Sequence, residues 1–165
     1  ATVEKATAVL ANAGCDLLTV HARPQVMAAA ARGAAGSELK ILGVTVLTSL
    51  TDDDLKADDH SLSAAELVER RVRQALEAGI HGVVSSPHEA GRAREIAVAA
   101  GREDFLIVTP GVRPAGAAMD DQARAATPAS ALQSGATHLV IGRPITAVAD
   151  PRAAAQAITQ EIALV

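Results

Sequence analysis

Residues 41–49 form the stretch that decides the fold: Ile41-Leu42-Gly43-Val44-Thr45-Val46-Leu47-Thr48-Ser49. Its apolar part, from Ile41 to Leu47, is too continuous for a strand with one face in water, because such a strand alternates apolar and polar residues. The run therefore predicts a strand covered on both faces, which is typical of a parallel sheet packed between layers. Two polar residues, Thr48 and Ser49, follow where this strand ends.

The same cycle of helix and apolar run repeats on both sides of this stretch, with glycines ending the helical patterns. Five buried strands that alternate with helices predict a parallel sheet joined by right-handed crossovers. The expected strands are 15–20, 41–47, 82–85, 105–109 and 138–141. The expected helices are 3–13, 24–32, 63–78, 88–100, a short one opened by Thr127-Pro128, and a last one capped by Asp150 before Pro151.

The chain has 165 residues and a mass of 16.7 kDa, which predicts a single α/β domain over 1–165. Two architectures fit the pattern: an open doubly wound sheet of five strands, or part of a (β/α)₈ barrel. A complete barrel takes about 250 residues. In either architecture, the site is expected at the carboxyl ends of the strands.

Composition excludes several classes of function. The net charge is −4 and Phe105 is the only aromatic residue, so the chain lacks the basic field and stacking side chains of a nucleic-acid binder. No apolar run reaches the roughly 18 residues of a membrane span, and no secretory signal opens the chain, so a cytoplasmic protein is expected. Cys15, the single cysteine, cannot form an internal disulfide and is expected to be a buried, inert thiol.

Two strand ends combine glycine with arginine, in Pro110-Gly111-Val112-Arg113-Pro114 and in Gly142-Arg143-Pro144. Glycine lets backbone N–H groups approach an anion closely, and arginine can bind phosphate through two hydrogen bonds. Both segments follow the last two strands, where barrel enzymes frequently bind a substrate phosphate. The alternative is that both are ordinary Gly-Pro turns with solvated arginines.

Other candidate sites are weaker. Asp52, Asp53 and Asp54 lie at an expected helix start, where carboxylates interact favourably with the helix dipole, and this explains them better than a metal site. The five histidines show no ligand spacing, and no phosphate-loop or dinucleotide-binding glycine pattern is present. Ser85-Ser86 lies outside a nucleophile-elbow motif and is expected to cap the following helix.

Taken in order, the strand ends resemble those of the bacterial orotidine 5′-phosphate decarboxylases, and the match runs from end to end. The most specific signals are two segments that occur together, separated by Asp121-Gln122 and Thr127-Pro128. These segments are Thr-Pro-Gly-Val-Arg-Pro at 109–114 and Val-Ile-Gly-Arg-Pro-Ile-Thr at 140–146.

The resemblance implies a (β/α)₈ barrel, of which this chain carries about the last five βα units. It also implies a homodimer that converts orotidine monophosphate to uridine monophosphate without metal or organic cofactor. Arg143 and Gln122 resemble the family's phosphate-binding residues, with Gly142 and Arg113 beside them. The remaining matched positions are Thr48 and Ser49 at the pyrimidine, Pro110 in the pocket wall, and Thr2, which in the family reaches the partner's substrate.

The sequence also departs from the family pattern. The family's catalytic Asp-x-Lys-x-x-Asp-Ile-Pro-x-Thr segment would end at Thr2, so no catalytic residue is expected within 1–165. This exact chain is expected to be inactive alone. After His21, whose role the resemblance leaves open, Arg23-Pro24-Gln25 replaces the usual small residues and glycine pair. The alternative function is a non-catalytic partial barrel that binds phosphate or a nucleotide. A phosphosugar decarboxylase of the same superfamily ranks third.

Overall fold

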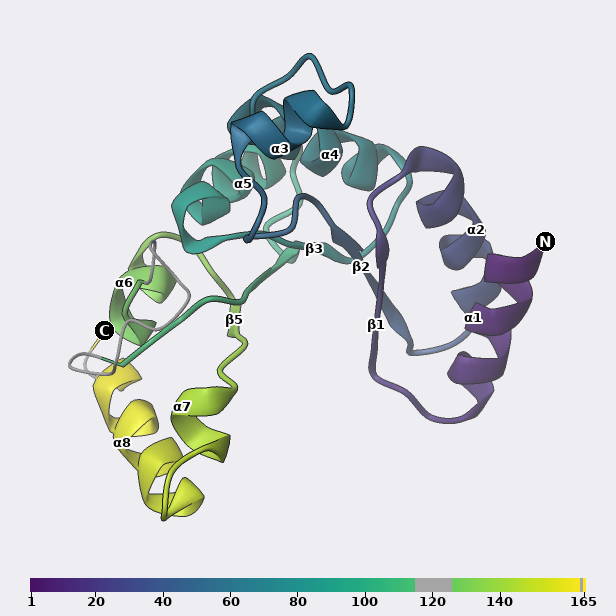
Figure 1. Ribbon diagram of the computed structural model, residues 1–165. Helices are drawn as coiled ribbons and strands as arrows, with labels where there is room; N and C mark the ends of the chain where they lie inside the picture. The colour runs from purple at the N-terminus through teal and green to yellow at the C-terminus, as the bar shows by residue number, and fades with distance from the viewer. Residues whose placement is uncertain (115–125, 164) are drawn as a thin grey trace.

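The computed structural model describes residues 1–114, 126–163 and 165. Its parallel sheet has the strand order β1-β2-β3-β4-β5, so each strand pairs with its neighbour in the sequence. Figure 1 shows the sheet as part of an arc, with most helices on the convex side and the two termini at opposite ends. The strands are β1 Leu17–His21, β2 Lys40–Val44, β3 Gly82–Val84, β4 Leu106–Thr109 and β5 His138–Leu139.

The helices begin and end close to the predicted positions. Asp150 accepts a hydrogen bond from the backbone N–H of Ala153 at 2.9 Å, which confirms the predicted cap of the last helix. The helix α7 was not predicted, because its Gly-Arg-Pro start is typical of a turn. The helices are α1 Thr2–Asn12, α2 Pro24–Ala34, α3 Asp52–Ala57, α4 Ala64–Glu77, α5 Pro87–Ala99, α6 Pro128–Gln133, α7 Arg143–Thr146 and α8 Pro151–Ile162.

The main core lies between the sheet and α2, α4 and α5. Ile41, Val83 and Ile107, from the three middle strands, are fully buried there together with Phe105. Close packing of β3 on β4 requires glycine at position 82, because an added Cβ would collide with the backbone oxygen of Leu106. The middle strands are therefore held on the helix side by a continuous apolar layer.

The prediction of five buried strands is wrong at both edges of the described sheet. Exposed residues alternate with half-buried ones along β1, and in β5 His138 is exposed while Leu139 is half-buried. Each of these strands pairs on one side only among the described residues, so fewer neighbours cover it. Cys15, just before β1, is also exposed, which contradicts the expected buried thiol.

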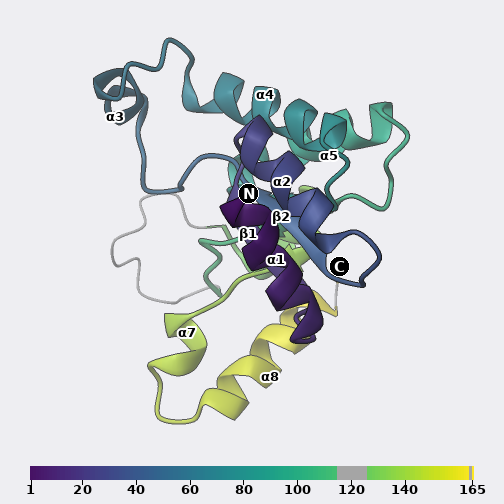
Figure 2. The ribbon, with the colours of Figure 1, turned by 90° about the vertical axis from the view of Figure 1, so that its right-hand side faces the viewer.

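The segment between β2 and α4 projects from the rest of the molecule and contains α3 (Figure 2). Its helix starts with a reciprocal cap, in which the Thr51 hydroxyl accepts from the backbone N–H of Asp54 and the Asp54 carboxylate accepts from Thr51. This confirms that the acidic run lies at a helix start. None of the described helices combines the length and apolarity needed to cross a bilayer.

Candidate active site

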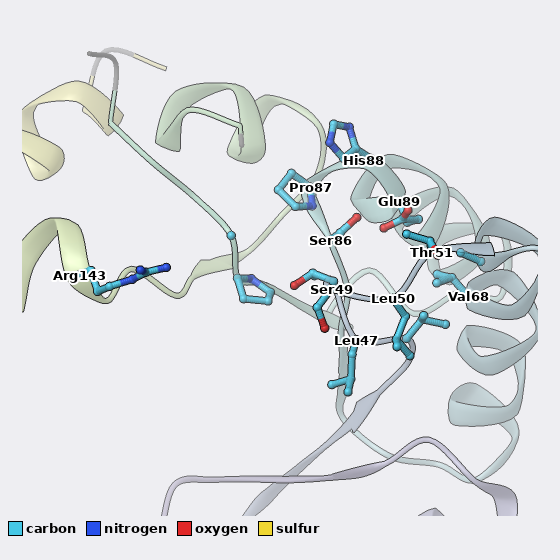
Figure 3. Close-up of a pocket in the computed structure, with 15 residues that line it drawn as sticks. Leu47, Ser49, Leu50, Thr51, Val68, Ser86, Pro87, His88, Glu89 and Arg143 are labelled. Carbon is cyan, nitrogen blue, oxygen red and sulfur yellow. The ribbon is translucent and has the colours of Figure 1, made fainter. Parts of the chain in front are cut away.

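The carboxyl ends of the strands surround a cavity of about 430 Å³. Segments far apart in the sequence meet here: the loop after β2, the start of α5, the loop after β4 and the start of α7. Figure 3 shows Arg143 extending from α7 toward the side chains of the β2 loop. Of the eight residues predicted to bind substrate, four line this cavity: Thr48, Ser49, Pro110 and Arg143.

The loop after β2 supplies Thr48 and Ser49, and hydrogen bonds hold it at both ends. At its start, the Thr45 hydroxyl donates to the backbone oxygen of Val84 at 2.9 Å, which ties the end of β2 to β3. At its far end, Asp54 accepts hydrogen bonds from the Thr51 hydroxyl and backbone, and these lower the pKa of its carboxyl group. The loop is therefore joined to β3 at its start, while the hydrogen bonds at its far end lie within the cap of α3.

The start of α5 forms a second wall, which sequence analysis missed as part of the site. Ser86, Pro87, His88 and Glu89 line the cavity. Ser86 stands at the predicted cap position, but its side chain makes no capping hydrogen bond, and its Oγ is buried without a partner. The prediction that Ser86 caps this helix is therefore wrong, because Ser86 occupies the cap position without making the capping hydrogen bond. The Ser-x-x-Glu spacing at 86–89 is the same as that at Ser63, where the cap does form, so the sequence held no signal that this helix start differs.

The loop after β4 contributes Pro110 and Gly111 to the cavity but turns Arg113 away from it. Gly111 has a φ of 79°, a left-handed conformation that favours glycine. Arg113 donates its backbone N–H to Ala126 at 2.9 Å, and its Nη1 donates to the backbone oxygen of Val112 at 3.2 Å. Among the described contacts, Arg113 binds its own loop and does not line the cavity.

Arg143 is the cationic side chain among the described cavity-lining residues. It begins α7, and the oxygen of Gly142 accepts the N–H groups of Ile145 and Thr146 at 2.8 and 3.0 Å. Gly142 has a φ of −101°, and an added Cβ would meet no atom within 4 Å. The predicted close approach of an anion to the backbone N–H groups at this glycine stays a prediction.

Thr2 and Gly142, two other predicted binding residues, are not among those that line the cavity. Thr2 is exposed at the start of α1, and Gln122 lies outside the described residues. His21, also exposed, ends β1 and is not among the cavity-lining residues either. In residues 1–114 and 126–163, no three His, Cys, Asp or Glu side chains gather closely enough to hold a metal ion.

The cavity can bind a small molecule that carries an anionic group. Arg143 offers a guanidinium that can donate two hydrogen bonds to an oxyanion, and the hydroxyl groups of Thr48 and Ser49 can bind polar atoms on another part of the ligand. The three lysines of the chain lie elsewhere: Lys5 in α1, Lys40 at the start of β2, and Lys56 in α3, where it pairs with Asp53. No lysine therefore lies at the carboxyl end of a strand, where the cavity is.

The sequential strand order from β1 to β5, with most helices on the convex side of the curved sheet, is that of a partial α/β barrel. The chain belongs to the orotidine 5′-phosphate decarboxylase / HUMPS family, whose model matches residues 1–158. It is 65% identical over 163 residues to the orotidine 5′-phosphate decarboxylase of Caulobacter vibrioides, covering 99% of this chain and 70% of that protein. Identity to the Cereibacter sphaeroides enzyme of the same name is 54% over 165 residues, covering 98% and 69%.

A solved structure supports the same grouping. The crystal structure of orotidine 5′-phosphate decarboxylase from Lactobacillus acidophilus matches with a TM-score of 0.80 and 37% sequence identity. The match covers 98% of this chain and 69% of that chain. The prediction of an α/β barrel fold from the decarboxylase family is confirmed.

Proposed function

We propose that this chain binds the substrate in an orotidine 5′-phosphate decarboxylase, which converts orotidine monophosphate to uridine monophosphate and carbon dioxide. The observation that carries the proposal is the convergence of Arg143 with Thr48, Ser49 and Pro110 on one cavity. Arg143 binds the phosphate, and Thr48 and Ser49 contact the pyrimidine across the cavity. By the family resemblance, Gln122, Gly142 and Arg113 are assigned to the same proposed phosphate site, and Arg113 would have to leave the contact with its own loop to reach it.

The five βα units are proposed to be the last five of the barrel and to form one domain over 1–165. Barrel enzymes frequently bind phosphate at the loops after strands seven and eight. The two Gly-Arg loops of this chain follow β4 and β5, so these strands correspond to the seventh and eighth. This placement rests on the strand-end residues alone.

Decarboxylation at the pyrimidine ring forms a poorly stabilised carbanion, so the enzyme must supply complementary charge and a proton donor. Lys5, Lys40 and Lys56 are not among the residues that line the cavity, so none of them is placed to be that donor. We therefore propose that the proton comes from a group outside residues 1–165. No metal or organic cofactor is proposed.

The active protein is proposed to be a cytoplasmic homodimer. Thr2 supports this proposal, because it matches the family threonine that reaches the partner's substrate, and it is exposed at the start of α1. Sedimentation analysis over a range of protein concentrations tests the dimer. A single monomeric species throughout that range contradicts it.

Calorimetric titration with uridine monophosphate and with uridine tests the phosphate assignment. Hydrogen bonds to charged groups contribute about 1.5–3 kcal/mol, so the nucleotide is expected to bind about tenfold to a hundredfold more tightly than the nucleoside. Arg143→Ala is expected to remove this advantage. Arg152→Ala is the matched control, because Arg152 is an exposed arginine on the neighbouring α8.

Equal affinity for nucleotide and nucleoside contradicts the assignment of Arg143. The release of carbon dioxide from orotidine monophosphate, measured on the same samples, separates the enzyme from the non-catalytic nucleotide binder. Binding without turnover, even in a protein that carries the family's Asp-x-Lys-x-x-Asp segment ahead of Thr2, favours the binder.

A further inference from the structure

The junction between β1 and α2 is a part of the strand-end surface that the proposed function does not use. Here the chain reads His21-Ala22-Arg23-Pro24, and Arg23 is the cap residue of α2. The sequence departs from the resembled family at this loop. The junction lies on β1, at the opposite edge of the described sheet from β5 and Arg143.

Arg71 reaches this junction from α4. Its Nη1 donates a hydrogen bond to the backbone oxygen of Ala22, which is fully buried. The Arg71 side chain is only partly exposed, and its Nε is buried with no hydrogen-bond partner. One side of the guanidinium is thus fixed against the strand end, while another N–H group has nothing to bind.

No carboxylate compensates Arg71 among the ion pairs of the described residues, and the same holds for Arg23 and Arg70. By contrast, Arg73 on α4 and Arg92 on α5 both pair with the carboxylate of Glu69. Burial lowers the pKa of Arg71, and the positive charges of Arg23 and Arg70 lower it further. The junction therefore concentrates positive charge that the described part of the chain does not balance.

A purely structural role explains only part of this arrangement. The hydrogen bond to Ala22 satisfies a buried backbone oxygen, as folding requires. It does not require the exposed Arg23 and Arg70, whose positive charges disfavour the charged form of the partly buried Arg71. The first turn of α2 holds no acidic residue that would offset them. A bound anion would remove this cost.

We propose that Arg71 and Arg23 form a second oxyanion site, separate from Arg143, that binds a phosphate group. Arg71 is fixed by Ala22 through Nη1 and binds the anion through its other terminal nitrogen, Nη2, and the exposed Arg23 closes over the anion from the loop. Arginine suits this role because its planar group can bind phosphate through paired hydrogen bonds.

The test is calorimetric titration of inorganic phosphate at low ionic strength into the Arg143→Ala protein, where the proposed substrate site is disabled. Phosphate is expected to bind this protein still. Adding Arg23→Gln is expected to weaken the remaining binding about tenfold, which corresponds to the loss of one hydrogen bond to a charged group. Adding Arg71→Gln is expected to weaken it at least as much.

Arg73→Gln is the matched control, because Arg73 lies on the same helix but pairs with Glu69, and it should leave phosphate binding unchanged. If Arg71→Gln fails to fold, Arg23→Gln still decides the matter, since Arg23 is exposed. The proposal is overturned if Arg143→Ala alone abolishes phosphate binding. It is also overturned if the Arg143→Ala protein binds phosphate and neither Arg23→Gln nor Arg71→Gln weakens that binding. Failure of the nucleotide titration at Arg143 leaves this test unaffected.

Discussion

The three middle strands of the sheet and its two edge strands are held in different ways. Ile41 in β2, Val83 in β3 and Ile107 in β4 are fully buried under the helices. At the edges, Leu17 in β1 is 44% exposed, and Val140, directly after β5, is 49% exposed. The residues that follow β5 continue this trend, because α7 has no buried residue and α8 has one, Ile158.

This difference also runs through the proposed substrate site. Pro110 directly follows the buried strand β4, whereas Thr48 and Ser49 lie in an exposed loop and Arg143 begins α7, which has no buried residue. Regions with few buried apolar contacts open at lower free energy than the core. We therefore expect Arg143 to be more mobile than Pro110, and its position to be more sensitive to contacts made on ligand binding.

The largest expected effect on the free energy of unfolding comes from a comparison of one valine in the middle of the sheet with one at its edge. Val83→Ala removes two methyl groups from a fully buried position and should lower the free energy of unfolding by about 2 kcal/mol, through lost burial and a cavity. Val140→Ala makes the same chemical change at a half-exposed position and should cost less than about 0.5 kcal/mol. Urea unfolding of both variants measures the difference. Equal costs would show that the edge is packed as tightly as the middle.

The second comparison is between two glycines, Gly82 in the middle of the sheet and Gly142 at its edge. It tests how closely the backbone of a neighbouring strand approaches each of them. Gly82→Ala should lower the free energy of unfolding by about 1–3 kcal/mol, because its Cβ meets the backbone oxygen of Leu106, which cannot move without disturbing β4. Gly142→Ala is the edge counterpart. Its Cβ meets open space, so its effect on stability should stay within about 0.5 kcal/mol, as measured by the same unfolding experiment.

His81 carries a pH-dependent contact between two middle strands. Its Nδ1 accepts a hydrogen bond from the backbone N–H of Ile41 at 3.0 Å, which requires a neutral ring. Burial lowers the pKa of His81 below its ordinary value of 6.5, and nearby Arg102 and Lys40 lower it further, while Asp104 acts in the opposite direction. The unfolded chain therefore binds the proton more readily. Stability from this contact is present above pH 6.5 and is lost as the pH falls.

His81→Gln tests this linkage. At pH 7.5 the wild-type protein should be more stable than the variant by about 1 kcal/mol, the contribution of one hydrogen bond. The difference should shrink as the pH is lowered toward 5, when urea midpoints are measured for both proteins side by side. A difference that stays constant over this range would mean that the His81 ring does not titrate with a lowered pKa.

The sequence predicted the middle of the molecule better than its edges, for physical reasons. Continuous apolar runs such as 41–47, and glycines at helix ends such as Gly79, are local signals of strands and helices. The order of the strand-end motifs likewise predicted that Thr48, Ser49, Pro110 and Arg143 would meet. The exposure of an edge strand depends on what packs against it, and the sequence of the strand alone does not determine that.

Three site features could not be predicted for the same reason. The absent cap at Ser86 is not distinguishable by spacing from the cap that forms at Ser63. Arg113 turns toward its own loop because the backbone bridge from Val112 to Ala126 sets its direction. Arg71 looks like any other arginine on the polar face of a helix, and only its contact with Ala22 distinguishes it.

The smallest expected effect on stability concerns Cys15, at the entrance to the edge strand β1. Cys15 is exposed, so Cys15→Ser should change the free energy of unfolding by less than about 0.5 kcal/mol. The thiol should react with a chromogenic disulfide in the folded protein at nearly the rate found in urea, because access does not require opening of the sheet. A reaction that becomes fast only on unfolding would mean that β1 is covered in solution. The edge strand β1 would then be as inaccessible as the middle strands, which would indicate that a partner covers it.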